Sequence, residues 1–224
     1  MAATPQAQAT TPKPPPAPPP NSIPISFSLG DRIIDGAVVK PVTFAAFNDF
    51  ITEAQTMTQP QTWEGKLRRV RMTKQVVYYA NGVPAPLTQE EVLRMPIPAA
   101  RNIAARLDEN EGKLGKIVRA GDGIDQAIIY ELGTPLQMRS KEPITIRELE
   151  FMAKTYGDIE DVLAAPTTFQ QAAQLIATVA KPLGTSLTAL PSWAVGQIMF
   201  ADGFAIVRDV LPHFLGSPAE SPSE

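Results

Sequence analysis

Two stretches of this chain resemble each other, and this internal correspondence constrains the fold more than any other feature. Residues 25–30, a polar turn and residues 40–50 are matched later by residues 128–133, a polar turn and residues 142–152. A weaker correspondence follows in the second part of each copy. A duplicated unit predicts tandem copies of one small module, which present the same kind of surface twice.

We expect an α+β protein in which each module is a β-hairpin followed by three or four helices, with a disordered Pro-rich tail at the N-terminus. The expected boundaries are a tail at 1–22, a first module at 23–107, a linker at 108–126, a second module at 127–215 and a disordered C-terminus at 216–224. The tail ends in a run of prolines, which lack an amide donor and have a fixed φ, so it is expected to be extended.

Alternation of apolar with polar or small residues predicts the strands. This spacing is typical of a half-buried strand, and a turn followed by a second short strand completes a hairpin in each module. The alternating residues are Ile25, Phe27 and Leu29 in the first copy and Ile128, Tyr130 and Leu132 in the second.

Capping signals predict where the helices begin. Thr145 and Glu148 have the spacing of a capping box, and Thr43 is the equivalent cap in the first copy. Helical spacing of apolar residues follows both caps, so we expect helices from Thr43 and from Thr145.

Further helices are expected near 63–79 and 167–180 and over 192–211, where Gly203 is a weak point. A second capping box at Thr88 and Glu91 begins a short helix, which prolines interrupt before a helix at 99–107.

Composition excludes several classes of protein. The 224 residues contain no cysteine, and the net charge of −3 is spread along the chain, which gives no general attraction to nucleic acid or anionic membrane. No apolar run is long enough for a membrane helix, and the N-terminus lacks a secretion signal. We expect a protein that stays in the cytoplasm and does not bind membranes.

The residue types needed for catalysis are scarce. His213 is the only histidine, so a histidine-based triad or metal cluster cannot form within one chain. Asp158, Glu160 and Asp161 are interpreted as acidic residues in the first turn of a helix, where the helix dipole favours them. We expect no enzymatic activity, no cofactor and no metal site.

Basic residues gather in the predicted helix that begins near Trp63. Lys66, Arg68, Arg69, Arg71 and Lys74 are interleaved with apolar residues. We interpret the cluster as a solvated helix face, with a contact to an acidic protein surface and a contact to nucleic acid phosphates as the alternatives.

The second copy, residues 127–211, resembles the tail assembly chaperones of Mu-like contractile-tailed bacteriophages. The similarity lies in a strand pair leading into residues 143–149, an acidic segment after Gly157, an apolar helix around Ile176, and a last helix with Phe200 and Phe204. The resemblance is to apolar patterns, and the first copy shows it more weakly.

The resemblance implies a protein that binds without doing chemistry, in the cytoplasm of the host cell. Its partner would be the tape measure protein, with the tail tube protein as a further candidate; nucleic acid is disfavoured. The partner-binding candidates are the apolar residues Trp63, Trp193, Phe200 and Phe204 and the basic residues Arg68, Arg69 and Arg71. A structural tail or baseplate component and a nucleic-acid-associated accessory protein are the alternative functions.

Overall fold

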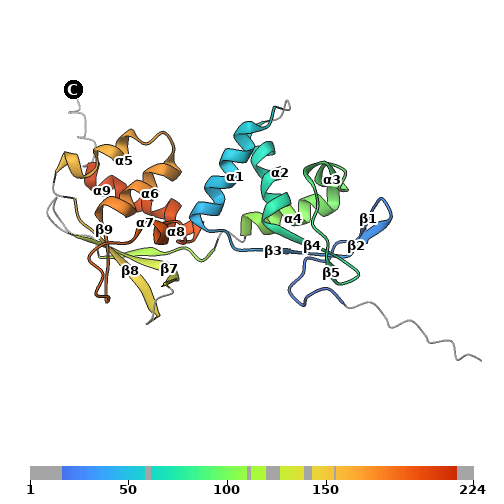
Figure 1. The fold of residues 1–224 in the computed structure, drawn as a ribbon, viewed down its shortest axis with the longest axis horizontal. Coiled ribbons are helices and arrows are strands. Elements are labelled where there is room, and N and C mark those ends of the chain that lie inside the picture. The colour runs from blue at the N-terminus through green and yellow to red at the C-terminus, as the bar shows by residue number, and fades with distance from the viewer. Residues whose placement is uncertain are drawn as a thin grey trace, which may run out of the picture.

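In this computed structural model, the structure describes residues 17–58, 62–109, 112–119, 127–138, 143–153 and 155–215. Most of the predicted N-terminal tail and the whole predicted C-terminal segment lie outside the described residues. The fold is mixed α+β with small antiparallel sheets, as expected. The first half of the chain is residues 17–109 and the second half is residues 112–215. Figure 1 shows the helices of each half lying on one side of that half's strands.

The first half begins with a hairpin of β1 (Phe27–Leu29) and β2 (Arg32–Ile34). Gly30 at the turn has a φ of 63°, a conformation that glycine adopts without strain. The turn is tighter than expected, because β2 lies inside the segment predicted as turn. The next strand, β3 (Gly36–Val39), pairs instead with β4 (Val76–Ala80), and β5 (Val83–Pro84) completes a three-stranded sheet.

Helix α1 (Phe44–Thr56) begins at the predicted cap, since the Thr43 hydroxyl accepts from the Ala46 amide at 3.4 Å. Its first two amides are satisfied by the other half of the chain. Phe44 N–H donates to the Ile198 carbonyl at 2.8 Å, and Ala45 N–H donates to the Gly196 carbonyl at 3.0 Å. The beginning of α1 is therefore fixed by residues far away in sequence.

Helix α2 (Trp63–Lys74) is shorter than predicted, because the chain turns at Gln75 into β4. The residues after the turn are β-branched and aromatic, which favours a strand, and they pair with β3. The predicted capping box at Thr88 and Glu91 is confirmed at the start of α3 (Gln89–Leu93). Helix α4 (Ile97–Glu109) follows after Pro96.

The second half is built on a four-stranded antiparallel sheet in the order β6-β7-β8-β9. Its strands are β6 (Lys116–Arg119), β7 (Ile128–Met138), β8 (Ile144–Phe151) and β9 (Ala180–Pro182). Strand β6, at one edge, falls within the segment predicted as linker. Thr134 and Pro135, predicted as a turn, lie inside β7, where the pairing with β8 shifts register.

The predicted helix from Thr145 is wrong, because this segment is strand β8. Its inward residues Ile146, Leu149 and Phe151 are fully buried, and β8 pairs with β7 and β9. The Thr145 hydroxyl bonds to Gln137 Oε1 at 2.8 Å across the sheet and caps no helix. Pairing on both edges with burial of one face outweighs a local capping pattern.

The helices of the second half follow as a short η1 (Tyr156–Asp158), α5 (Glu160–Ala164), α6 (Thr168–Val179), α7 (Ser192–Val195), α8 (Phe200–Ala205), a π-helical turn η2 (Ile206–Val210) and α9 (Leu211–Leu215). Helix α6 has the expected extent, and the Thr167 hydroxyl caps it by accepting from the Gln170 amide at 3.1 Å. The expected helix at 192–211 is interrupted at residues 196–199, and Gly203 lies inside α8.

The structure does not show the predicted repeat. Where the first half places helix α1 after its strands, the second half places strand β8, and the sheets of the two halves differ in strand number and order. In the sequence correspondence, residues 25–30 and 128–133 both contain strands, whereas residues 40–50 and 142–152 pair a helix with a strand.

A cluster of aromatic rings joins the two halves. Phe44 and Phe47 of α1 pack against Phe169 of α6 and Phe200 of α8. Each half also has its own core, one around the four-stranded sheet and one under α2, α3 and α4. We call this cluster of aromatic rings the seam. Because α1 packs against both halves, burial of the rings in the seam links the stabilities of the two halves.

In the part of the chain that the structure describes, none of the helices has the length and apolar character that a membrane span requires.

Candidate partner-binding site

Three of the four apolar candidates keep a large part of their surface in solvent. Trp63 is 42 % exposed at the start of α2, Trp193 is 51 % exposed on α7 and Phe204 is 46 % exposed on α8. Phe200 is buried, and its ring stacks on that of Phe47 with a centroid separation of 3.9 Å. Phe200 therefore belongs to the seam between the halves, and Phe204 covers it with a centroid separation of 6.0 Å.

The basic candidates also divide into exposed and buried residues. Arg68 is exposed, whereas Arg69 and Arg71 are buried, so the predicted solvated face does not include these two. The Arg71 guanidinium donates to the Leu107 carbonyl at 2.8 Å and to Gln75 Oε1 at 3.1 Å. It also lies over the Phe47 ring, 5.6 Å from its centroid. Arg71 thus ties the end of α4 to α2 and α1.

An apolar groove of about 330 Å³ runs between α2, α3 and α4. We call it the α2–α4 groove. Its floor is made by side chains that also belong to the core, and its rim carries Leu93 and Ile97, which are 52 % and 70 % exposed. The apolar lining comprises Met72, Val92, Leu93, Met95, Ile97, Ala100 and Ala104. Figure 1 shows the three helices next to one another.

The charged residues that line the α2–α4 groove are all arginines. Arg68 and Arg69 come from α2, and Arg101 comes from α4; Arg68 and Arg101 are exposed, whereas Arg69 is buried. Within the part of the chain that the structure describes, no acidic side chain lines the groove. A net-acidic chain therefore presents a local positive potential around an apolar surface.

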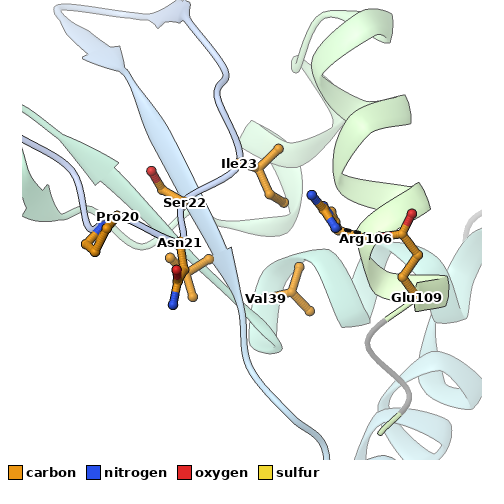
Figure 2. Close-up of a pocket in the computed structure, with 8 residues that line it drawn as sticks. Pro20, Asn21, Ser22, Ile23, Val39, Arg106 and Glu109 are labelled. Carbon is orange, nitrogen blue, oxygen red and sulfur yellow. Dashed lines mark hydrogen bonds and ion pairs between the residues drawn. The ribbon is translucent and has the colours of Figure 1, made fainter. Parts of the chain in front are cut away.

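A larger cavity, of about 660 Å³, lies between the N-terminal segment, β3 and α4. Figure 2 shows Arg106 and Glu109 facing each other at its rim, and their ion pair measures 2.7 Å. The charges at this rim neutralise each other. The remaining lining comes largely from residues 20–23 and β3. This cavity offers neither an unbalanced charge nor any of the residues singled out in the sequence.

Asp202 is a fully buried carboxylate at the start of α8. Its Oδ1 accepts from the Gly115 and Gly133 amides at 2.9 and 3.0 Å and from the Tyr130 hydroxyl at 3.3 Å, while Oδ2 accepts from the Thr134 amide at 3.3 Å. Burial raises the pKa of this carboxyl above its ordinary value, and the hydrogen bonds partly offset the increase. The same burial, together with the Asp202 charge, raises the pKa of Tyr130.

The role of Asp202 in this arrangement is structural. Its donors come from β7 and from the residue before β6, so it fastens α8 onto the sheet. A Cβ at Gly115 or at Gly133 would overlap neighbouring backbone oxygens, so only glycine allows the chain to approach so closely at these positions.

Sequence reasoning missed Leu93, Ile97, Arg101 and Asp202. The buried residues of α4 are Ala99, Ile103 and Leu107, spaced four apart, and Ile97 lies outside that spacing. The signal in the sequence for an exposed apolar surface was Ile97, an apolar residue outside the buried face of α4. Asp202 could have been recognised as a single acid within an otherwise apolar helix.

Comparisons of the chain with models of protein families, with curated proteins and with solved structures find no match. Among the described residues, no group of three or more His, Cys, Asp and Glu side chains is arranged to hold a metal ion.

Proposed function

We propose that this chain is a non-enzymatic phage tail assembly protein, a chaperone that binds the tape measure protein and keeps it soluble during tail assembly. The observation that carries the proposal is the exposure of large apolar side chains on helices. Both tryptophans of the chain are about half exposed, as is Phe204. Large aromatic side chains are enriched where proteins meet other proteins.

The physical task suits a binding protein. A tape measure protein is a long helical chain whose apolar stripes lack a partner until the tail tube closes round it. A chaperone that covers these stripes stabilises the soluble form by mass action, to an extent set by its concentration relative to the dissociation constant. Helical partners dock through apolar side chains placed in grooves on the receiving protein.

Co-expression tests the proposal. The cognate tape measure protein, produced alone and together with this chain, is divided into soluble and insoluble fractions, and the soluble fraction is purified through a tag on this chain. We expect the tape measure protein to move to the soluble fraction and to co-purify. An unchanged insoluble fraction together with no co-purification would disprove the chaperone function.

A matched pair of variants sharpens the test. Trp63→Ser and Trp193→Ser replace exposed side chains, so both variants are expected to fold with an unfolding midpoint near that of the wild type. Loss of co-purification in either variant locates the contact. If both variants co-purify as much tape measure protein as the wild type does, the tryptophans are not part of the contact.

A further inference from the structure

We infer that the α2–α4 groove receives an amphipathic helix whose apolar stripe is flanked by carboxylates. This inference deepens the proposed function and rests on it for the natural partner. It names the site on this chain and the chemistry of the segment that the site recognises.

Charge complementarity selects the flanks of the partner. Arg68 and Arg101 line the groove with exposed side chains, and among the described residues no acidic side chain lines it, so glutamates or aspartates beside an apolar stripe would meet a positive potential. A stripe flanked by lysines would be repelled. Charge pairs of this kind set specificity and association rate more than total affinity.

The walls of the groove select a helix over an extended strand. An extended peptide needs a sheet edge to satisfy its backbone amides and carbonyls. The groove is bounded by α2, α3 and α4, whose backbone groups are largely used within the helices. The occupant must therefore satisfy its own backbone groups, which a helix does.

The size of the groove limits how much of the partner enters. A volume of about 330 Å³ lies at the small end of the range of roughly 300 to 1,000 Å³ seen for ligand pockets, so the groove takes a few side chains. Leu93 and Ile97 then lie beside the inserted side chains and lose their exposure to water. Residues spaced i, i+3, i+4 and i+7 on the partner helix fit this arrangement.

Two designed helical peptides with the same leucine stripe test the inference on the full chain. One peptide has glutamates beside the stripe and the other has lysines, and binding is measured by fluorescence anisotropy. We expect the glutamate peptide to bind at least about tenfold more tightly, with the difference shrinking as salt increases. Equal affinities, or no binding of either peptide, would overturn the inference.

Substitutions locate the site. Leu93→Ser combined with Ile97→Ser is expected to weaken the glutamate peptide at least about tenfold. The matched control combines Ile33→Ser and Val83→Ser, which lie on β2 and β5 and are 55 % and 56 % exposed. The control is expected to bind like the wild type. If the two double variants bind the glutamate peptide equally, the groove is not its binding site.

The tape measure protein separates this inference from the proposed function. If that protein co-purifies equally with the Leu93→Ser/Ile97→Ser variant and with the wild type, the groove is not the chaperone site although the chaperone function stands. If it never co-purifies while the glutamate peptide binds in the groove, the proposed function fails and the groove chemistry holds. Binding of DNA that Arg68→Glu abolishes, or self-association that Ile97→Ser abolishes, would assign the groove to a different occupant.

Discussion

Phe44 of α1 and Phe169 of α6 stack with their ring centroids 3.7 Å apart and their planes 18° from parallel. These residues come from opposite halves of the chain, and Gly203 of α8 leaves the space that the Phe44 ring occupies, since a Cβ there would overlap the ring. The stacked pair and the glycine beside it connect α1, α6 and α8.

Gly203→Ala is expected to destabilise the protein by about 1 to 3 kcal/mol, because the added methyl group forces the Phe44 ring out of its position. Gly157→Ala is the control, since its Cβ would meet only the Thr155 hydroxyl at 3.7 Å. Urea unfolding of both variants checks the result. A Gly203→Ala variant as stable as the control would show that the seam can rearrange at no cost.

Asp202→Ala is expected to lower the free energy of unfolding by at least about 1 to 3 kcal/mol, because it leaves buried amide donors without an acceptor. Asp209→Ala removes a partly exposed partner of Arg208 and is expected to cost only about 0 to 1 kcal/mol. Thermal and urea unfolding of the two variants provide the comparison. Similar losses would contradict the structural role of Asp202.

The pH dependence of stability follows from the raised pKa of Asp202. A carboxyl whose pKa is higher in the folded state than in the unfolded state contributes stability below its unfolded pKa, and this contribution is lost as the pH rises through its folded pKa. The wild type is therefore expected to lose stability relative to the non-titrating Asp202→Asn variant across that interval. Unfolding free energies of both proteins, measured at intervals from about pH 3.5 upward, test this. A wild type that gains stability relative to Asp202→Asn as the pH rises would contradict the predicted sign.

Glu91 is expected to change stability with pH in the direction opposite to that of Asp202. The Thr88 amide donates to its carboxylate, which lowers the pKa of Glu91, and Arg32 pairs with the same side chain. The stability it contributes is present above its unfolded pKa and is lost as the pH falls through its folded pKa. Glu91→Gln is expected to flatten this acid-side loss relative to Glu90→Gln, which changes the exposed neighbour. Acid titrations of both variants, followed by circular dichroism, make the measurement.

Arg71→Lys is expected to cost about 1.5 to 3 kcal/mol, because a lysine cannot reproduce the paired contacts with the Leu107 carbonyl and Gln75. Arg68→Lys changes an exposed member of the same cluster and is expected to stay within about 0.5 kcal/mol of the wild type. Chemical unfolding distinguishes the two. Equal effects would mean that Arg71 contributes no more than a surface charge.

Local signals predicted the elements that local chemistry controls. The caps at Thr43 and Thr88 and the β1 strand were predicted from neighbours within a few residues and are present, although Gly196 and Ile198 also fix the beginning of α1. Thr145 carried an equally good capping pattern, yet its segment became β8. Strand pairing with β7 and β9 is a property of the tertiary structure, and a single sequence window does not contain it.

The candidate site was predictable only in part. Exposure of Trp63 and Trp193 could not be deduced from helical spacing, because aromatic residues at such positions are equally compatible with a core. The burial of Arg71 could not be deduced for a similar reason, since its contacts come from α1 and α4. The α2–α4 groove depends on three helices meeting and has no signature within any one of them.

The Asp202 contacts also determine the order in which a nascent chain can finish folding. Asp202 lies 87 residues after Gly115 and 69 after Gly133, so strands β6 and β7 leave the ribosome well before the carboxylate that binds their amides. Closing such long loops is slow compared with forming local helices. During synthesis, these contacts can therefore form only after the C-terminal helices are made, and a translation product truncated before residue 202 would lack the acceptor for those amides.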